Sequence, residues 1–301
     1  MAAQTTITGP AAAGAKTLPP ELQRAVGRVT ELGSLPEVTT RIVELVENPR
    51  ATAGQVHEVV RSDPALAARI LKLVNSAFYG LPAQIASLER AIVMLGLSAL
   101  KNLALATSLL RLFKSEDLSA QFKTRDLWRH CVAVAVAARH IAQIGRAVPP
   151  DEAFVAGLMH DLGIIVGQQV LPERLAAVID QCGQEPQNFV ACEQRGLGTD
   201  HQTIGLTLAT KWKFPPALRN AIGYHHEPSS LQPEYQRLAT AIYVADTLAC
   251  DERCGFWLSA AGQTRSDWMF TQLNLPAEEL ERVRGELPER MAEAVQIFGE
   301  N

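Results

Sequence analysis

The sequence predicts an all-α protein, and three observations support this class. Apolar residues recur at helical spacing along almost the whole chain beyond Pro19-Pro20. Several of these runs begin at a residue suited to cap a helix and end at a glycine. The chain also contains no Asn-Gly, Asp-Gly or Gly-Gly dipeptide of the kind that closes a β-hairpin. We therefore expect short helices joined by short loops.

The N-terminal part of the chain divides into a tail and a helical subdomain. Residues 1–17 are dominated by Ala, Thr and Gly and have little apolar surface to bury, so we expect a disordered tail. The helical subdomain is predicted over residues 18–114. Its clearest helices begin at Pro64 after the capping residues Ser62-Asp63, at Ser87 with an end at Gly96, and at Ser98.

The charged stretch Lys114–Asp126 is poor in apolar residues and marks the predicted boundary. A second helical domain is expected over residues 115–301. Its predicted helices span Asp126–Ile144, Asp151–Ile165, Pro172–Gln181, His201–Trp212, Pro216–His226 and Arg237–Cys250, with a closing helix over Pro276–Phe298.

Composition excludes several classes of function. The 28 Lys+Arg and 32 Asp+Glu residues give a net charge of -4, which disfavours a nucleic-acid partner. Apolar runs such as Leu103–Leu110 are much shorter than the roughly 20 residues that span a bilayer, and no signal peptide opens the chain. We expect a cytoplasmic protein with no membrane partner. The five cysteines contain no C-x-x-C pair, which favours reduced, buried thiols.

Ionisable residues interrupt helices that are otherwise apolar. His160 and Asp161 lie within the predicted helix Asp151–Ile165, Asp246 lies within Arg237–Cys250, and His130 precedes the apolar run Val132–Ala138. An unpaired buried ion costs several kcal/mol even after relaxation. These residues must therefore share partners, and imidazoles with carboxylates in one interior are a common composition of a metal site.

Spacing extends this candidate metal site. Asp126 and His130 are four residues apart and face the same side of one helix. Asp161 is placed to bridge two ions while the adjacent His160 serves one. His201 begins a helix that has Asp200 or Thr199 as its cap, and His225 and His226 end another. The predicted metal ligands are Asp126, His130, His160, Asp161, His201, His225, His226 and Asp246.

These residues resemble those of a known family. The order His130, His160-Asp161 and Asp246 resembles the H…HD…D signature of the HD superfamily, whose helical members often hold metal ions for phosphate-ester hydrolysis. Leu35–Val38, Ser62–Gly80 and Ser87–Gly96 strongly resemble the HDOD domain, an HD-related output domain of bacterial signalling proteins. The resemblance implies an N-terminal HDOD bundle packed on an HD-like domain over residues 115–301.

The resemblance also bears on catalysis. HDOD domains are regarded as signalling or interaction modules that have lost catalysis. Compared with the related HD-GYP phosphodiesterases, which cleave cyclic di-GMP, this chain has a residue matching each metal-ligand position. It departs from their HD-x-G-K pattern at Ile164, which replaces the lysine, and it has no Gly-Tyr-Pro element after Glu227. The metal ligands are therefore expected to remain, while the cation that meets a substrate phosphate is lost.

Three functions remain open from the sequence. The favoured one is a non-catalytic signal-transduction module that holds one or two divalent ions (Fe, Mn, Zn or Ni) and engages other signalling proteins. An alternative is a metal-dependent phosphohydrolase acting on a phosphodiester such as a cyclic dinucleotide, and a nucleotide or phosphodiester ligand is open in either case. The third is a helical scaffold whose histidines and aspartates are hydrogen-bonded to each other without an ion.

Overall fold

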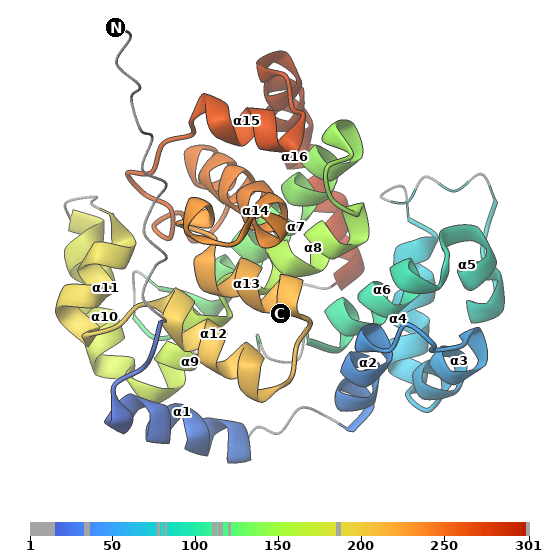
Figure 1. Cartoon of the computed structure of the whole chain (residues 1–301), viewed down its shortest axis with the longest axis horizontal. Coiled ribbons are helices and arrows are strands. Elements are labelled where there is room, and N and C mark those ends of the chain that lie inside the picture. The colour runs from blue at the N-terminus through green and yellow to red at the C-terminus, as the bar shows by residue number, and fades with distance from the viewer. Residues whose placement is uncertain are drawn as a thin grey trace, which may run out of the picture.

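The computed structural model describes residues 16–32, 37–76, 79, 81, 83–109, 113, 117–119, 122–184 and 188–298. The predicted tail therefore lies almost entirely outside the described residues. Within them the chain is helical and has no β-strand, which confirms the predicted fold class (Figure 1).

The first part of the fold is a bundle of short helices. Its helices are α2 (Glu37–Glu47), α3 (Ala53–Arg61), α4 (Pro64–Val74), α5 (Leu88–Leu95) and α6 (Leu97–Leu109). The predicted caps are present: Asp63 Oδ1 accepts a hydrogen bond from the Leu66 amide at 3.0 Å, and Ser87 Oγ accepts one from Arg90 at 3.3 Å. Local sequence thus determines where these helices begin.

The second part is built around one buried helix. Its helices are α7 (Thr124–Gly145), α8 (Pro150–Met159), α9 (Leu162–Val170), α10 (Pro172–Gln184), α11 (Phe189–Leu197), α12 (His201–Lys211), α13 (Pro216–Tyr224), the 3-10 turn η2 (Pro228–Ser230), α14 (Pro233–Asp251), α15 (Asp267–Leu273) and α16 (Ala277–Phe298). Most of α7 is inaccessible to solvent, and it packs against α8, α14 and α16. The closing helix α16 therefore completes the shell around α7.

The two parts are connected across several helices. In the bundle, α6 packs against α8, and α4 packs against α16, with Lys72 Nζ donating to the Gln296 carbonyl at 2.9 Å. Helix α1 (Pro20–Leu32) lies apart from the bundle and packs against α9 and α12 (Figure 1). The first helix of the predicted N-terminal subdomain thus covers the second part. The predicted boundary between residues 114 and 115 stays a prediction.

The single helix predicted over Asp151–Ile165 is wrong. Helix α8 ends at Met159, and the backbone leaves helical geometry at Asp161, which has φ −92° and ψ 19°, so α8 and α9 are separate helices. The reason is tertiary: α9 packs so closely on α12 that a Cβ on Gly163 would lie 1.8 Å from the carbonyl oxygen of His201. The residues on both sides of the break are apolar, so the sequence pattern predicts one continuous helix and gives no sign of the break.

The segment made of α8 and α9 has the length and composition of a membrane-spanning helix. Pro150–Val170 is, among the described residues, the one stretch long and apolar enough to cross a membrane by length and composition. However, 89% of its apolar window is buried inside the fold, as is usual for a core segment of a globular domain. The segment is therefore explained by packing around α7.

Candidate metal centre

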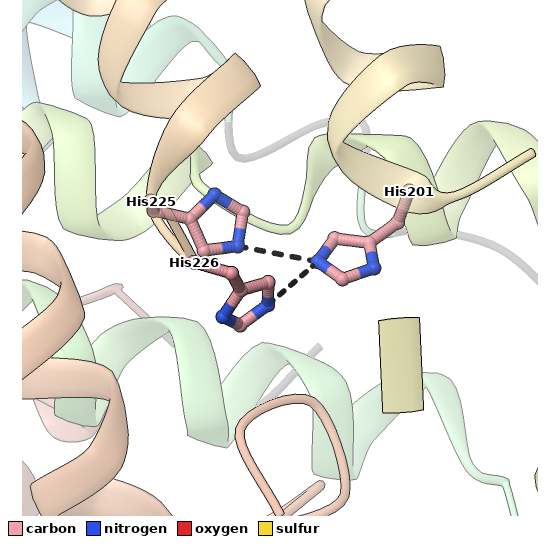
Figure 2. A group of neighbouring side chains, drawn as sticks. All are labelled: His201, His225 and His226. Atoms are coloured by element: carbon pink, nitrogen blue, oxygen red, sulfur yellow. Dashed lines mark hydrogen bonds between the residues drawn. The ribbon is translucent and has the colours of Figure 1, made fainter. Parts of the chain in front are cut away.

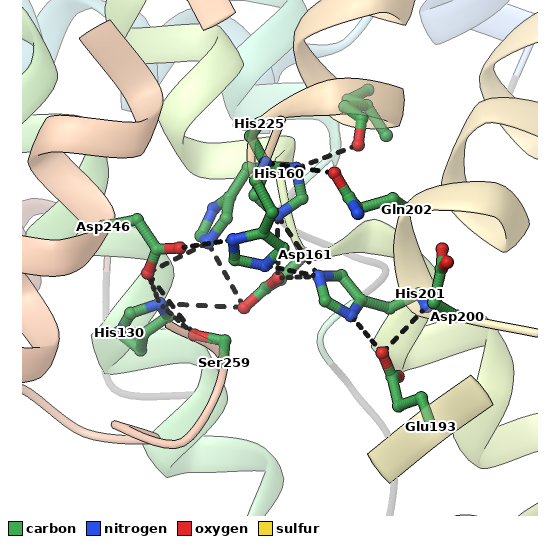
Figure 3. Close-up of polar contacts among 12 residues, drawn as sticks. His130, His160, Asp161, Glu193, Asp200, His201, Gln202, His225, Asp246 and Ser259 are labelled. Atoms are coloured by element: carbon green, nitrogen blue, oxygen red, sulfur yellow. Dashed lines mark hydrogen bonds and ion pairs between the residues drawn. The ribbon is translucent and has the colours of Figure 1, made fainter. Parts of the chain in front are cut away.

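Seven of the eight predicted ligands converge in one interior; Figure 3 labels six of them, and Figure 2 labels the seventh, His226. They come from α7, from the break between α8 and α9, from the start of α12, from the end of α13 and from α14. The converging residues are His130, His160, Asp161, His201, His225, His226 and Asp246; all but His226 are completely inaccessible to solvent. We call this set the His/Asp cluster.

Asp161 lies between two groups of imidazoles. Its Oδ2 is 3.2 Å from His160 Nε2 and 3.6 Å from His130 Nε2. Its Oδ1 is 3.4 Å from His201 Nε2 and 3.7 Å from His225 Nε2. Each carboxylate oxygen therefore faces a different group, which is the arrangement of a bridging ligand.

The first group consists of His130, His160 and Asp246. Asp246 Oδ1 lies 3.1 Å from His130 Nε2 and 3.8 Å from His160 Nε2. Ser259, from the loop after α14, places its Oγ 3.1 Å from His130 Nε2 and 3.4 Å from Asp246 Oδ1. One ligand atom from each member of the group lies within 4.8 Å of the others.

The second group consists of three histidines (Figure 2). The Nε2 atom of His201 is 3.2 Å from that of His225 and 3.0 Å from that of His226. A nitrogen lone pair on each ring directed to one point is the geometry by which imidazoles ligate a metal.

Hydrogen bonds at Nδ1 orient the rings of both groups. Nδ1 of His160 donates to the Gly157 carbonyl at 2.8 Å, and Nδ1 of His225 donates to the Ile222 carbonyl at 2.9 Å. Both acceptors are backbone carbonyls one turn earlier on the same helix. In the neutral rings, the remaining lone pair is therefore on Nε2, which is the atom that points into the cluster.

Glu193 orients the third ring and was missed by the sequence analysis. This buried carboxylate on α11 accepts from the backbone amide of His201 at 3.1 Å and from its Nδ1 at 2.5 Å. A carboxylate behind a ligating histidine is a common second partner in metal sites. No periodic signal connects Glu193 to His201, because a loop between two helices separates them.

Charges within the cluster shift the pKa values of its members. Burial lowers the pKa of His160, but the nearby Asp161 carboxylate outweighs it and the net shift is upward. Burial raises the pKa of Asp161, but His160 and the other imidazoles hold it well below the usual range. Burial and neighbouring imidazoles lower the pKa of His226 to about 3, so this ring is neutral at pH 7. Burial also raises the pKa of Asp246, but its hydrogen bond with His130 and the other imidazoles lower it overall, so both carboxylates of the cluster are ionised at pH 7.

Several polar atoms of the cluster have no hydrogen-bond partner among the described residues. They are His160 Nε2, both carboxylate oxygens of Asp161, and Asp246 Oδ2. Leaving buried carboxylate oxygens without a donor is unfavourable by several kcal/mol. A divalent cation coordinated by each group would satisfy these atoms. The imidazole and carboxylate donors therefore fit a divalent metal.

Asp126 is the predicted ligand that the structure does not place in the cluster. Its side chain is half-buried one turn before His130, and its backbone carbonyl accepts from the Phe256 amide at 2.9 Å. Among the described residues, no hydrogen bond or ion pair joins its carboxylate to the cluster. Its role as a ligand stays a prediction.

Other potential donors have different surroundings. Cys131 could share an ion with His160 and Asp161, but burial strongly raises the pKa of its thiol and so disfavours a thiolate. His57 lies 2.7 Å from Glu89, and His140 lies 3.6 Å from Glu286, both away from the cluster. Neither histidine belongs to the set of ligands predicted from the sequence.

A pocket of about 460 Å³ leads from the surface to one edge of the cluster. His226 and Gln263 line it, and Gln263 contacts His226 Nδ1 at 2.6 Å. Lys16, Asp200 and Glu227 also line the pocket, and Lys16 forms an ion pair with Glu227. The cluster is thus reached from the side of His226. We call this space the cluster pocket.

Ile164, at the position of the lysine in the HD-GYP pattern, has no charge to offer a phosphate. Ile164 is completely buried in the hydrophobic core. An apolar side chain contributes no cation to the neighbourhood of Asp161. No other residue of α9 replaces the missing lysine, because the described residues of this helix include no lysine or arginine.

The fold is thus an all-α domain whose interior holds imidazoles and carboxylates in the chain order His130, His160-Asp161 and Asp246, which is the class of a helical protein with a candidate metal centre. A sequence profile of the HDOD domain matches residues 32–228, about two thirds of the chain. The chain belongs to the HDOD domain family.

Three solved structures are similar to this one. An HDOD domain protein of unknown function from Geobacter sulfurreducens has a TM-score of 0.71 and 24% identity, covering 92% of this chain and 98% of that chain. A candidate phosphohydrolase from Shewanella amazonensis SB2B has a TM-score of 0.69 and 25% identity. The match covers 91% of this chain and 98% of that chain. A candidate signal transduction protein from Marinobacter aquaeolei VT8 has a TM-score of 0.74 and 25% identity. The match covers 93% of this chain and 64% of that chain.

A curated relative is longer than this chain. An uncharacterized protein of Treponema pallidum (strain Nichols) is 26% identical over 222 residues, which are 73% of this chain and 42% of that protein. The chain therefore spans less than half the length of that relative.

Proposed function

We propose that this protein is a non-catalytic signal-transduction output module that holds one or two divalent metal ions in the His/Asp cluster. The observation that carries this proposal is the position of Asp161, whose two oxygens face separate groups of buried imidazoles. Ions in these groups would hold α7, α12, α13 and α14 together at one point, so metal binding would be coupled to folding.

The donor atoms indicate a class of metal and do not select one element. Imidazole and carboxylate ligands suit iron, manganese, zinc or nickel, and the high thiol pKa of Cys131 disfavours a thiolate-rich site. His130, His160 and Asp246 would hold one ion, and His201, His225 and His226 the other. Asp161 would serve both.

Two features of the access route support a role without catalysis. Within the cluster, His226 alone lines the cluster pocket, so a substrate would meet one edge of the second group. The pocket also carries the carboxylates of Asp200 and Glu227, and its lysine, Lys16, is already paired with Glu227. Among the described residues, this lining therefore offers no unpaired lysine or arginine to the phosphate of a phosphodiester.

The output of such a module would be a contact with another signalling protein. The similarity to the Marinobacter aquaeolei signal transduction candidate, at 25% identity, supports this direction. We place the protein in the cytoplasm, and we propose neither a nucleic acid nor a membrane as its partner.

A metal-dependent phosphohydrolase is the second candidate function. It is favoured by the bridging position of Asp161, because paired ions activate water and polarise a phosphoryl group. The similarity to the Shewanella amazonensis phosphohydrolase candidate points the same way. Against it stands Ile164, since removal of a single group that stabilises a transition state electrostatically costs about 2.7 to 4 kcal/mol where a hydrogen-bond donor is lost.

One experiment separates these functions. The metal content of the purified chain is measured by mass spectrometry, and hydrolysis of bis(p-nitrophenyl) phosphate and of cyclic di-GMP is followed in the same sample. Asp161→Asn serves as the metal-depleted control. We expect bound metal, less metal in the variant and no hydrolysis above the variant. Metal with hydrolysis that Asp161→Asn abolishes would establish the phosphohydrolase, and no metal would establish the ion-free scaffold.

A further inference from the structure

A second pocket, of about 670 Å³, lies between α1, α12 and α13. Three cationic side chains line it: Lys16, Lys211 and Arg219. The described residues of its lining include no carboxylate, although the whole chain has a net charge of -4. Lys16 is paired with Glu227 outside this lining, so the positive charge of the pocket comes from Lys211 and Arg219, and we call it the basic pocket.

Two of these cations, Lys211 and Lys16, are held in place by polar contacts. Lys211 Nζ donates to the Gly27 carbonyl at 3.0 Å, which joins the end of α12 to α1. Lys16 Nζ lies 4.7 Å from the ring centroid of Tyr224 and pairs with Glu227, at the boundary with the cluster pocket. Arg219 extends from α13 on the other side. An anion between α12 and α13 would therefore meet preformed positive charge.

The rest of the lining favours an organic anion over a bare ion. Leu18, Val26 and Leu206 provide apolar surface, and Thr207 and Asn220 provide hydrogen-bonding groups. A volume of 300 to 1,000 Å³ with apolar walls and a few polar groups is typical of pockets for small organic ligands. Inorganic phosphate would leave most of this space unfilled.

We propose that the basic pocket binds a nucleoside monophosphate or a molecule of that chemical class, with its phosphate at Lys211 and Arg219. The planar base would lie against Leu206, beside the buried side chains of Leu18 and Val26. This inference goes beyond the proposed function, because no predicted metal ligand lines this pocket. One structural element links the two sites: α12 begins at His201 in the His/Asp cluster and ends at Lys211.

The test measures binding of AMP, GMP, CMP and UMP to the full, metal-loaded chain by isothermal titration calorimetry. We expect at least one nucleotide to bind, and expect Arg219→Gln and Lys211→Gln each to weaken it about tenfold or more, since each removes a charge-assisted bond to phosphate. Arg90→Gln is the matched control, because Arg90 is exposed on α5 in the other part of the fold, and it should change the affinity less than twofold. Circular dichroism checks that all variants are folded.

Further probes separate this pocket from the metal centre. Binding should persist in Asp161→Asn, and it should be weaker for inorganic phosphate and for the uncharged nucleoside. Loss of binding in Asp161→Asn, with no effect of Arg219→Gln, would place the nucleotide at the metal centre and overturn the proposal. Absence of binding by all four nucleotides at millimolar concentration would also overturn it, and neither outcome affects the metal-content test of the proposed function.

Discussion

Gly163 lies directly against the carbonyl oxygen of His201, so closely that a methyl group on Gly163 would be 1.8 Å from that oxygen. Gly163 follows Asp161 by two residues, and His201 belongs to the second group of the His/Asp cluster. This backbone contact therefore holds the start of α12, and with it His201, close to the segment that carries the bridging carboxylate of Asp161. It also accounts for the direction that α9 takes after the break.

The first prediction concerns this contact. Gly163→Ala should destabilise the protein by about 3 kcal/mol, because the added methyl group forces α9 away from α12. Bound metal should fall as well. Gly167→Ala, also in α9, is the matched control: its methyl group would meet only Leu175 Cδ2 at 3.5 Å and Ile204 Cδ1 at 3.9 Å. Urea denaturation and metal analysis check both, and equal stabilities would contradict the prediction.

The second prediction concerns Glu193. Glu193→Gln keeps the size of the side chain but removes the charge that orients and polarises His201. Affinity for the second ion should fall about 10-fold to 100-fold, as is usual when a partner of a metal-ligating histidine is changed. The measurement is competition with a chelator of known affinity. Glu234→Gln, exposed at the start of α14, should have no effect, and an unchanged affinity in Glu193→Gln would exclude this role.

The third prediction is the effect of metal removal. A ligand that binds only the folded state stabilises it by about 2.7 kcal/mol when present at 100 times its dissociation constant. Removing the metal with a strong chelator should therefore lower Tm by several degrees. Scanning calorimetry before and after chelation measures the shift. The same Tm in both scans, for a sample first shown to contain metal, would argue against a stabilising ion.

The fourth prediction uses a histidine outside the cluster. Burial and the nearby Arg290 lower the pKa of His140 to about 4, although Glu286 opposes them. In the unfolded chain its pKa is about 6.5, so between pH 6.5 and 4 the unfolded state binds more protons. Stability from this group is complete above pH 6.5 and is lost as the pH falls toward 4.

The pH effect of His140 is measured by comparing two proteins. Both are stripped of metal, and their unfolding free energies are determined between pH 4 and 7.5. The wild-type protein should lose up to about 3 kcal/mol more than His140→Gln across this range, since each pKa unit corresponds to about 1.4 kcal/mol. Parallel pH profiles would show that His140 does not contribute.

Much of the fold could be predicted from short-range patterns. The caps at Asp63 and Ser87 and the stop at Gly96 are present as expected, because a cap is decided within a few residues. The membership of His130 and Asp246 in one cluster was also predictable. A buried charge in an apolar helix requires a partner, and this requirement is visible without knowing the fold.

The sequence by itself determined the all-α class, the starts of the capped helices at Pro64 and Leu88, and seven residues that meet in one interior. Only the tertiary structure decided the break at His160-Asp161, the carboxylate of Glu193 behind His201, and the position of α1 over α9 and α12. It also left the side chain of Asp126 without a contact to the cluster among the described residues. The physical reason is range: capping and periodicity act within a turn or two, whereas these features depend on helices that are distant in sequence and touch only after folding.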